Sequence, residues 1–338
     1  VRYQRSTSGT STVSNVKLVE TTSNPSTPTV NLEYSPRTTF DVTIDLNTTS
    51  TRAFEGGAYV GKHIKVIPKN TIDTDKGLLF NGAASVTIIG GHFRPSTRTT
   101  WSAGNNADGT FVFFNCGEFY MEGVHIDNIN VGDLDAVQCS AITSQTTCTI
   151  QYCRFDNVQG IESGLHGDIF QTGSTNMGKT GPVRINYMTG NCNYQGLFID
   201  PQNSGTRGGG LTSANIKNVN IKRNGSTTNR LYFFYATAAR YDTDGYPITL
   251  TNCWADPGSG QTVENDAVWP ADYAGSNNNF PTTKHRAVRG TDSTGAFAHW
   301  PGLTDTGKVL SGKIYEGTPP GGDFVPANKV GLNYSRPA

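Results

Sequence analysis

The stretch Val86-Thr-Ile-Ile-Gly-Gly-His-Phe93 determines the expected fold, because five further segments align with it without gaps. They begin at residues 119, 148, 183, 214 and 248, so successive starts are 33, 29, 35, 31 and 34 residues apart. The aligned segments are Phe119-Tyr-Met-Glu-Gly-Val-His-Ile126, Cys148-Thr-Ile-Gln-Tyr-Cys-Arg-Phe155, Val183-Arg-Ile-Asn-Tyr-Met-Thr-Gly190, Ala214-Asn-Ile-Lys-Asn-Val-Asn-Ile221 and Ile248-Thr-Leu-Thr-Asn-Cys-Trp-Ala255. Such a period indicates a solenoid.

Within each segment, apolar or small residues occupy the first, third, sixth and eighth places. This pattern predicts two short alternating strands with one phase shift between them. The shift falls at Gly90, Gly123, Tyr152, Tyr187, Asn218 and Asn252. Gly and Asn tolerate the backbone angles of a sharp bend. Because parallel pairing between coils satisfies the backbone, we predict an all-β chain. Its fold is a right-handed parallel β-helix of about six or seven coils, each 29 to 35 residues long.

A second strand precedes each segment, at 77–81, 111–115, 135–139, 168–172, 196–200 and 231–235. Extra residues fall mostly between the two strands, as in 173–182 and 201–213. Residues 1–50, rich in Thr and Ser, are expected to form an N-terminal extended arm or cap. The β-helix should span 51–258, with Ile64 and Val66 pointing inward in its first coil. Residues 259–338 lose the period and are expected to cover the open end or to support oligomerisation.

The charge balance narrows the range of partners. Lys and Arg number 27, Asp and Glu number 27, and charged residues make up 16% of the chain. This gives no electrostatic reason to expect nucleic acid or an anionic membrane as a partner. Since no run of about 18 apolar residues occurs, no membrane insertion is expected. The six cysteines form no CxxC pair, which disfavours a zinc site. They are expected to be buried hydrophobic residues, with a Cys139–Cys148 disulfide as the alternative.

The second strand suggests an aromatic binding surface. Its third place should face outward, yet it is apolar at Leu79, Phe113, Val137, Phe170, Phe198 and Phe233. We expect either a platform on which sugar rings pack or a patch covered by the arm, a corner loop or a neighbouring subunit. The fourth place brings Gln138 and Gln171 together, which are expected to pair inside the core.

Two carboxylates occupy the same place one coil apart, Asp135 and Asp168. Stacked strands lie about 4.8 Å apart. Like charges that close raise one pKa, as an acid and base pair for glycoside hydrolysis requires. His166 could assist proton transfer, and Glu162, Asp133 and Asp200 come from adjacent coils as ligand contacts. The structural alternative is that these Asp residues cap turn amides. No cofactor is expected, although Asp133, Asp135 and Asp168 could hold Ca²⁺ if the protein is a lyase.

The stretches Glu162-Ser-Gly-Leu-His-Gly-Asp-Ile-Phe-Gln-Thr172 and Tyr194-Gln-Gly-Leu-Phe-Ile-Asp200 resemble the pectate-lyase-like β-helix superfamily, including its phage-related members. The ending Pro319-Pro-Gly-Gly-Asp-Phe-Val-Pro326 is similar to that of phage tailspike or gene-transfer-agent spike proteins. The polygalacturonase pattern is not reproduced, which argues against pectin hydrolysis.

The resemblance implies recognition of a surface polysaccharide by a spike-like or adhesin-like protein, with or without cleavage of the glycan. It also implies an extracellular or virion-surface location, as a homotrimer or attached to a larger particle. Two alternatives remain open: a secreted polysaccharide lyase or glycoside hydrolase, and a structural virion component without glycan turnover.

Overall fold

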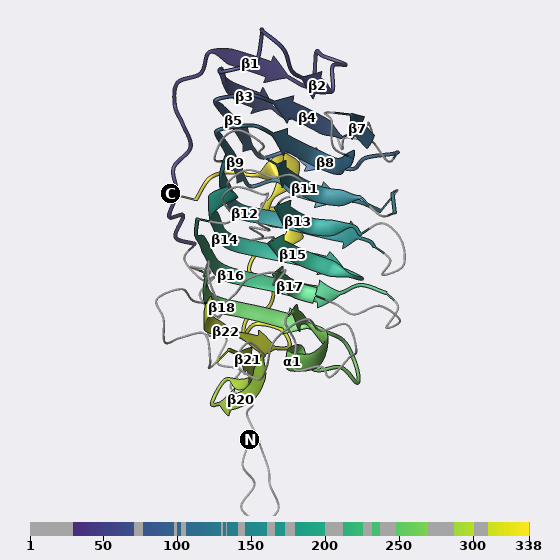
Figure 1. The fold of residues 1–338 in the computed structure, drawn as a ribbon, viewed down its shortest axis with the longest axis vertical. Coiled ribbons are helices and arrows are strands. Elements are labelled where there is room, and N and C mark those ends of the chain that lie inside the picture. The colour runs from purple at the N-terminus through teal and green to yellow at the C-terminus, as the bar shows by residue number, and fades with distance from the viewer. Residues whose placement is uncertain are drawn as a thin grey trace, which may run out of the picture. The chain divides into compact units, whose positions relative to one another are not determined.

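The computed structural model describes residues 30–70, 77–97, 100–102, 106–129, 131–132, 134–140, 146–160, 166–172, 180–199, 212–225, 232–236, 248–269, 287–300 and 310–337. The chain divides into two units, Val1–Val30 and Asn31–Ala338. The second unit is a parallel β-helix in which two sheets run side by side along a stack of coils (Figure 1). Across these ranges, no helix is long and apolar enough to cross a bilayer.

The first sheet is a ladder of parallel strands taken in chain order, closed at its end by an antiparallel hairpin. Its parallel members are β1 (Val42–Asp45), β3 (His63–Ile67), β5 (Ser85–Ile89), β9 (Glu118–Glu122), β12 (Thr146–Val158), β14 (Thr180–Cys192), β16 (Ala214–Arg223), β18 (Ile248–Asp256) and β22 (Leu310–Glu316). Two short strands, β6 (His92–Phe93) and β10 (His125–Asp127), continue β5 and β9 past the bend and pair with each other. Each backbone therefore finds its hydrogen-bond partners on the coils before and after it.

The predicted register of the six aligned segments is confirmed. Their third places pair in one continuous column: Ile88, Met121, Ile150, Ile185, Ile216 and Leu250. The column continues to Val66 and Ile44 at one end and to Gly312 at the other. Ile64 and Val66 are buried as predicted. Burying a residue of this size contributes about 1.5–3 kcal/mol.

The bend also lies where the sequence placed it. All six residues at the phase shift have left-handed backbone angles, with φ of 69° at Gly90, 66° at Gly123, 53° at Tyr152, 55° at Tyr187, 52° at Asn218 and 53° at Asn252. A side chain makes this conformation costly, by roughly 1–2 kcal/mol. At Asn218 and Asn252 the amides bond along the stack, since Asn252 Nδ2 donates to Asn218 Oδ1 at 2.8 Å.

The second sheet contains β2 (Ala53–Phe54), β4 (Leu78–Asn81), β8 (Asn106–Phe114), β11 (Asp135–Ser140), β13 (Asp168–Thr172), β15 (Gln195–Ile199), β17 (Tyr232–Ala236) and β19 (Val268–Trp269), with β7 (Thr100–Ser102) antiparallel to β8. Here the predicted alignment is only partly right. Val137 pairs with Phe170, as expected, but Phe113 pairs with Cys139 and Leu197 takes the place given to Phe198. In β4 and at the end of β8 consecutive residues are apolar, Leu78-Leu-Phe80 and Phe111-Val-Phe-Phe114, so alternation does not fix the register there.

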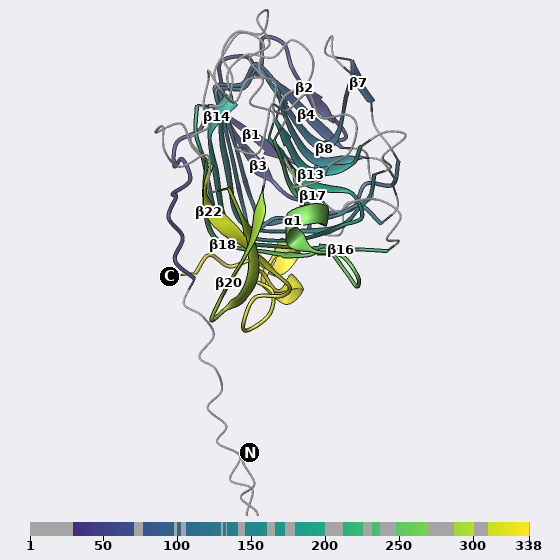
Figure 2. The same ribbon diagram turned by 60° about the horizontal axis from the view of Figure 1, so that its bottom comes forward.

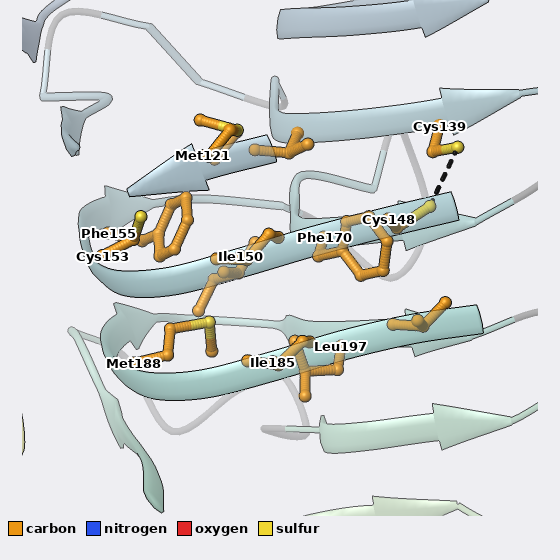
Figure 3. Packing of buried hydrophobic residues seen from close by; sticks show 14 of the residues in the cluster. Met121, Cys139, Cys148, Ile150, Cys153, Phe155, Phe170, Ile185, Met188 and Leu197 are labelled. Atoms are coloured by element: carbon orange, nitrogen blue, oxygen red, sulfur yellow. Dashed lines mark hydrogen bonds between the residues drawn. The ribbon is translucent and has the colours of Figure 1, made fainter. Parts of the chain in front are cut away.

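Aromatic rings fill the interior between the two sheets near the first coils. Phe54 and Phe80 stack with ring centroids 5.1 Å apart, and Phe80 stacks on Phe113 at 5.6 Å. Phe113 in turn lies 4.2 Å from Phe119 of the first sheet. Further along, Met121, Ile150 and Ile185 lie one above another (Figure 3). The core is therefore continuous from coil to coil.

The chain after residue 258 closes one end of the stack and then returns along it. Helix α1 (Val263–Asp266) precedes β19, and the antiparallel strands β20 (Val288–Asp292) and β21 (Gly295–His299) lead to β22 (Figure 2). Beyond β22, residues 319–337 form what we call the C-terminal strap, which includes the 3-10 turns η2 (Ala327–Lys329) and η3 (Gly331–Asn333). Figure 2 shows this yellow segment on the outside of the coils.

The C-terminal strap contacts one coil after another, in reverse chain order. Asp323 lies 2.6 Å from Lys222 of β16, and Val325 N donates to Thr189 Oγ1 of β14 at 2.9 Å. Arg154 of β12 donates to Asp323 at 3.0 Å. Gly331 N then donates to the carbonyl of Gly123 at 2.8 Å, beyond β9. The strap thus spans at least four coils of the stack.

An N-terminal segment, residues 31–40, lies on the outer face of the first sheet and meets the strap. The backbone of Tyr34 exchanges two hydrogen bonds with the side-chain amide of Gln151, at 3.0 and 2.9 Å. Glu33 pairs with Lys217 at 2.6 Å, two coils away. Arg336 of the strap donates to the carbonyl of Tyr34 at 3.0 Å.

Beneath this meeting point, Glu122 is fully buried. Its carboxylate accepts from the hydroxyls of Tyr120 and Tyr334, the latter at 2.7 Å. Gln151 Nε2 lies at 3.2 Å, and Arg336 forms an ion pair at 3.2 Å. A buried charge needs such partners to be tolerated. Glu122 therefore ties the strap and the N-terminal segment to the middle of the stack.

We predict that Gly123→Ala destabilises the protein more than Gly225→Ala. Both glycines have left-handed angles, φ 66° and 85°, so both variants carry the cost of a side chain there. Only at Gly123 would the added Cβ lie 2.1 Å from the ring of Tyr334, whereas nothing lies within 4 Å at Gly225. Melting temperatures compare the two losses, and limited proteolysis followed by mass spectrometry detects release of the strap.

The same pair is compared in a Tyr334→Ala background as the control. There the two glycine substitutions should cost about the same, because the steric conflict has been removed. Equal losses in the unsubstituted background would contradict the close approach at Gly123.

Candidate functional site

The predicted carboxylate pair is adjacent but buried. Asp135 begins β11 and Asp168 begins β13, and the two residues are 4% and 1% exposed. Asp168 N donates to Asp135 Oδ1 at 2.8 Å, so Asp135 accepts from the backbone of the next coil. This is the role of an Asp that caps an amide, the structural alternative considered for the pair.

Burial and the neighbouring Asp135 carboxyl raise the pKa of Asp168 well above its usual range. Within the described ranges, Asp168 Oδ1 is a buried atom with no hydrogen-bond partner. The pKa of the Cys192 thiol is raised, mainly by burial and then by the nearby Asp168 carboxyl. A protonated Asp168 next to an ionised Asp135 has the electrostatics of an acid and base pair. Both residues are buried, however, so a glycan cannot contact them.

Of the other residues predicted around this pair, the structure describes His166 alone. His166 is exposed, and its ring centroid lies 5.0 Å from that of Tyr194. Asp133, Glu162 and Asp200 lie outside the described residues. In the described ranges, no group of three or more His, Cys, Asp or Glu could hold a metal ion. The Ca²⁺ alternative stays a prediction, because Asp133 of the proposed ligand set lies outside the described residues.

The predicted outward aromatic ladder is wrong for Phe113 and Phe170. Both are 0% exposed and belong to the interior cluster. Phe113 stacks on Phe119, and Phe170 meets the same ring edge-on at 6.2 Å. Figure 3 shows Phe170 packed among core residues. For Phe170 the pairing with Val137 is as predicted, and the error lies in the face, because both side chains point into the core. Phe113 pairs with Cys139 instead, and this change of register also places it on the inward face.

Phe198 differs from the other two phenylalanines. It is half-buried and pairs with Gln171 rather than with Phe170. Gln171 in turn pairs with Gln138, so the predicted register of the two amides is confirmed. Their predicted place inside the core is not, because Gln171 is half-buried and Gln138 pairs with Val112 of a separate apolar cluster. A single half-buried ring does not make the extended platform that the sequence suggested.

An aromatic cleft lies elsewhere, on the outer face of the first sheet at the end of the stack. It has a volume of about 540 Å³, within the range of about 300–1,000 Å³ typical of ligand sites. Its floor is formed by β18 and β22, and the C-terminal strap provides one wall. The lining residues are Leu250, Thr251, Asn252, Trp254, Thr294, Gly312, Lys313, Tyr315, Pro319, Pro320 and Phe324.

Aromatic residues from three parts of the chain meet at this cleft. Trp254 of β18 and Tyr315 of β22 pair across the ladder, and their rings stack with centroids 4.7 Å apart. Phe324 of the strap is half-buried, with its ring 6.5 Å from that of Tyr187. The indole Nε1 of Trp254 donates to Asn252 Oδ1 at 2.9 Å. The cleft is therefore held in shape by the ladder, the ring stack and the strap.

The charge at the cleft is neutralised locally. Lys313 Nζ lies 2.6 Å from Asp292 Oδ2 and 4.8 Å from the centroid of Tyr315. Lys313 first, and then the Thr294 amide, hold the pKa of the exposed Asp292 carboxyl at about 2. The hydroxyls of Thr251 and Thr294 add uncharged polar groups at exposed positions. The site thus combines aromatic and proline carbon with a few polar groups, as ligand sites commonly do.

One sequence feature could have indicated this cleft. Trp254 occupies the seventh place of the repeat, an outward place that holds His, Arg, Thr or Asn in the other segments. A tryptophan there is a large apolar side chain on the outer face. Its partner Tyr315 lies outside the period, so the pairing itself could not be found from spacing.

In comparisons with known proteins, no family model, no curated protein and no solved structure matches the chain.

We predict that, as the pH rises, the stability of the Asp168→Asn variant falls less than the stability of the parent protein. The pKa of Asp168 is raised by folding, so above about pH 4 the unfolded chain releases a proton that the folded protein keeps. The contribution to stability is present in acid and is lost as pH rises toward the folded-state pKa. A neutral amide removes this dependence, and each pKa unit corresponds to about 1.4 kcal/mol. Denaturant titrations at about pH 5 and about pH 8 measure the difference between variant and parent.

The matched control is Asp292→Asn. Its carboxylate has a pKa of about 2 and is ionised throughout this pH window, so its effect on stability should not change between the two conditions. If Asp168→Asn likewise showed the same effect at both pH values, the raised pKa would be refuted.

Proposed function

We propose that this protein binds a neutral polysaccharide in the aromatic cleft formed by Trp254, Tyr315 and the C-terminal strap. The single observation that carries the proposal is the cleft itself, with aromatic and proline rings on its walls and floor. The C–H faces of sugar rings pack against such side chains, while hydroxyls bond to polar groups at the edge.

The charge distribution supports an uncharged ligand. Among the described residues that line the cleft, the cation is Lys313, and it is already paired with Asp292. Across the whole chain basic and acidic residues balance at 27 each. An anionic polysaccharide would gain little from such a surface, because steering requires an excess of opposite charge.

Binding without cleavage fits the cleft better than turnover. The cleft-lining residues, all within the described part of the chain, include no Asp, Glu or His. Glycoside hydrolysis needs two carboxyl groups flanking the scissile bond. The adjacent pair, Asp135 and Asp168, is buried in other strands. Recognition therefore forms the core of the proposal, and glycan cleavage does not.

The proposed location and assembly of the protein rest on the resemblance to spike proteins. A parallel β-helix that recognises a surface polysaccharide would work outside the cell or on a virion. We extend the proposal to such a spike-like or adhesin-like role, with attachment to a larger particle or self-association as its assembly. This extension rests on the likeness of two sequence stretches and of the ending at 319–326.

The test is binding of a glycan panel by the protein and by Tyr315→Ala and Phe324→Ala. The panel contains neutral glucans, galactans and mannans together with acidic polysaccharides, and isothermal titration calorimetry gives the affinity. Removing an anchoring ring should weaken binding at least about tenfold. Trp254→Ala is avoided because Trp254 is 4% exposed and supports the fold.

The control is Tyr59→Ala, a half-buried tyrosine that packs on Phe54 at the opposite end of the stack. It should leave glycan affinity unchanged. Binding of none of the neutral glycans, or equal affinity of Tyr315→Ala and the parent for those that bind, would overturn the proposal.

A further inference from the structure

Two cysteines face each other inside the β-helix. Cys139 lies in β11 of the second sheet and Cys148 in β12 of the first, and both are free thiols in the structure. Cys148 Sγ donates to Cys139 Sγ at 3.3 Å, the hydrogen bond that the dashed line in Figure 3 marks. The two residues are 0% and 1% exposed. Even carbon atoms in optimal non-bonded contact lie about 3.5–4.0 Å apart, so two larger sulfur atoms at this distance are unusually close.

We propose that Cys139 and Cys148 form a disulfide that cross-links the two sheets through the core. The pair belongs to strands that follow one another in the chain, nine positions apart. The bond would link β11 to β12 and restrict the unfolded chain, which is the usual source of disulfide stabilisation.

The remaining thiols are arranged differently. Cys116 directs its thiol at the carbonyls of Phe80 and Phe114, at 3.5 and 3.6 Å. Cys153 and Cys253 likewise contact backbone carbonyls. Cys148 also contacts a carbonyl, that of Thr146 at 3.7 Å, but among the described thiol contacts it is the one that also donates to a sulfur, that of Cys139. The geometry therefore selects one pair from the six cysteines.

The oxidation balances with a low-molecular-weight disulfide, such as oxidised glutathione, as the oxidant. The thiolate of one cysteine attacks a sulfur of this oxidant, which forms a mixed disulfide and expels one thiolate. The second cysteine loses its proton and attacks the protein-bound sulfur, which forms the Cys139–Cys148 bond and expels the second thiolate. Two protein thiols are oxidised and one external disulfide is reduced to two thiols.

The reaction belongs to the folding chain rather than to the folded one. Burial, and then contact with Cys139, raises the pKa of the Cys148 thiol far above its ordinary value. The reactive thiolate is scarce in such an environment. In the unfolded chain, before the two sheets pack together, both thiols are exposed to solvent and to the oxidant.

The experiment counts thiols in protein folded in the presence of reduced and oxidised glutathione. The sample is denatured without reductant, alkylated and weighed by mass spectrometry. The disulfide leaves four alkylated cysteines of the six, and prior reduction restores six. Peptide mapping without reduction should recover Cys139 linked to Cys148, a measurement that requires no variant.

Matched variants identify the pair. Cys139→Ser and Cys148→Ser should each leave five alkylated cysteines, whereas Cys116→Ser should leave three because the bond persists. Reductant should lower the melting temperature of the parent and of Cys116→Ser but not that of Cys139→Ser. Six alkylated cysteines in the unreduced parent, or a linked peptide containing any other pair, would overturn the proposal.

Discussion

The structure depends on parallel hydrogen bonding between residues one coil apart, and this bonding requires that every coil bend at the same place. The left-handed residues from Gly90 to Asn252 provide that bend. If one coil turned a position earlier, its inward side chains would meet the outward ones of its neighbours, and both the core column and the ladder would fail. The common bend therefore sets the register from β5 to β18. At β22 the ladder shifts by one residue between Leu250 and Cys253, and Trp254 pairs with Tyr315 beyond this shift.

The first sheet could be predicted residue by residue because its sequence carries two independent marks, apolar places and a bend residue. Ile150 and Tyr152 show both within one segment. The second sheet lacks such marks. Runs such as Phe111-Val-Phe-Phe114 are apolar on both faces, so sequence alone could not distinguish Phe113 from its neighbours. The adjacency of Asp135 and Asp168 was still predictable because both begin a strand.

The cleft and the C-terminal strap could not have been derived from the repeat. Both depend on residues after 258, whose contacts join positions far apart in the chain, such as Arg154 with Asp323. Polar side chains on an outer face ordinarily suggest solvent. Here Glu122 and Gln151 are instead covered by segments that have no period. Only the tryptophan at an outward place carried information about the cleft.

The strap also changes how the stack would respond to mechanical load. In a simple solenoid, tension on the last residue peels the final coil first, since each coil contacts only its neighbours. In this chain the Tyr334 hydroxyl donates a hydrogen bond to Glu122, which lies 212 positions away in the sequence. Tension on the chain end is therefore borne first near the middle of the stack, where it shears several hydrogen bonds at once. The terminal hairpin and the cleft beside it are shielded from that force until the strap detaches.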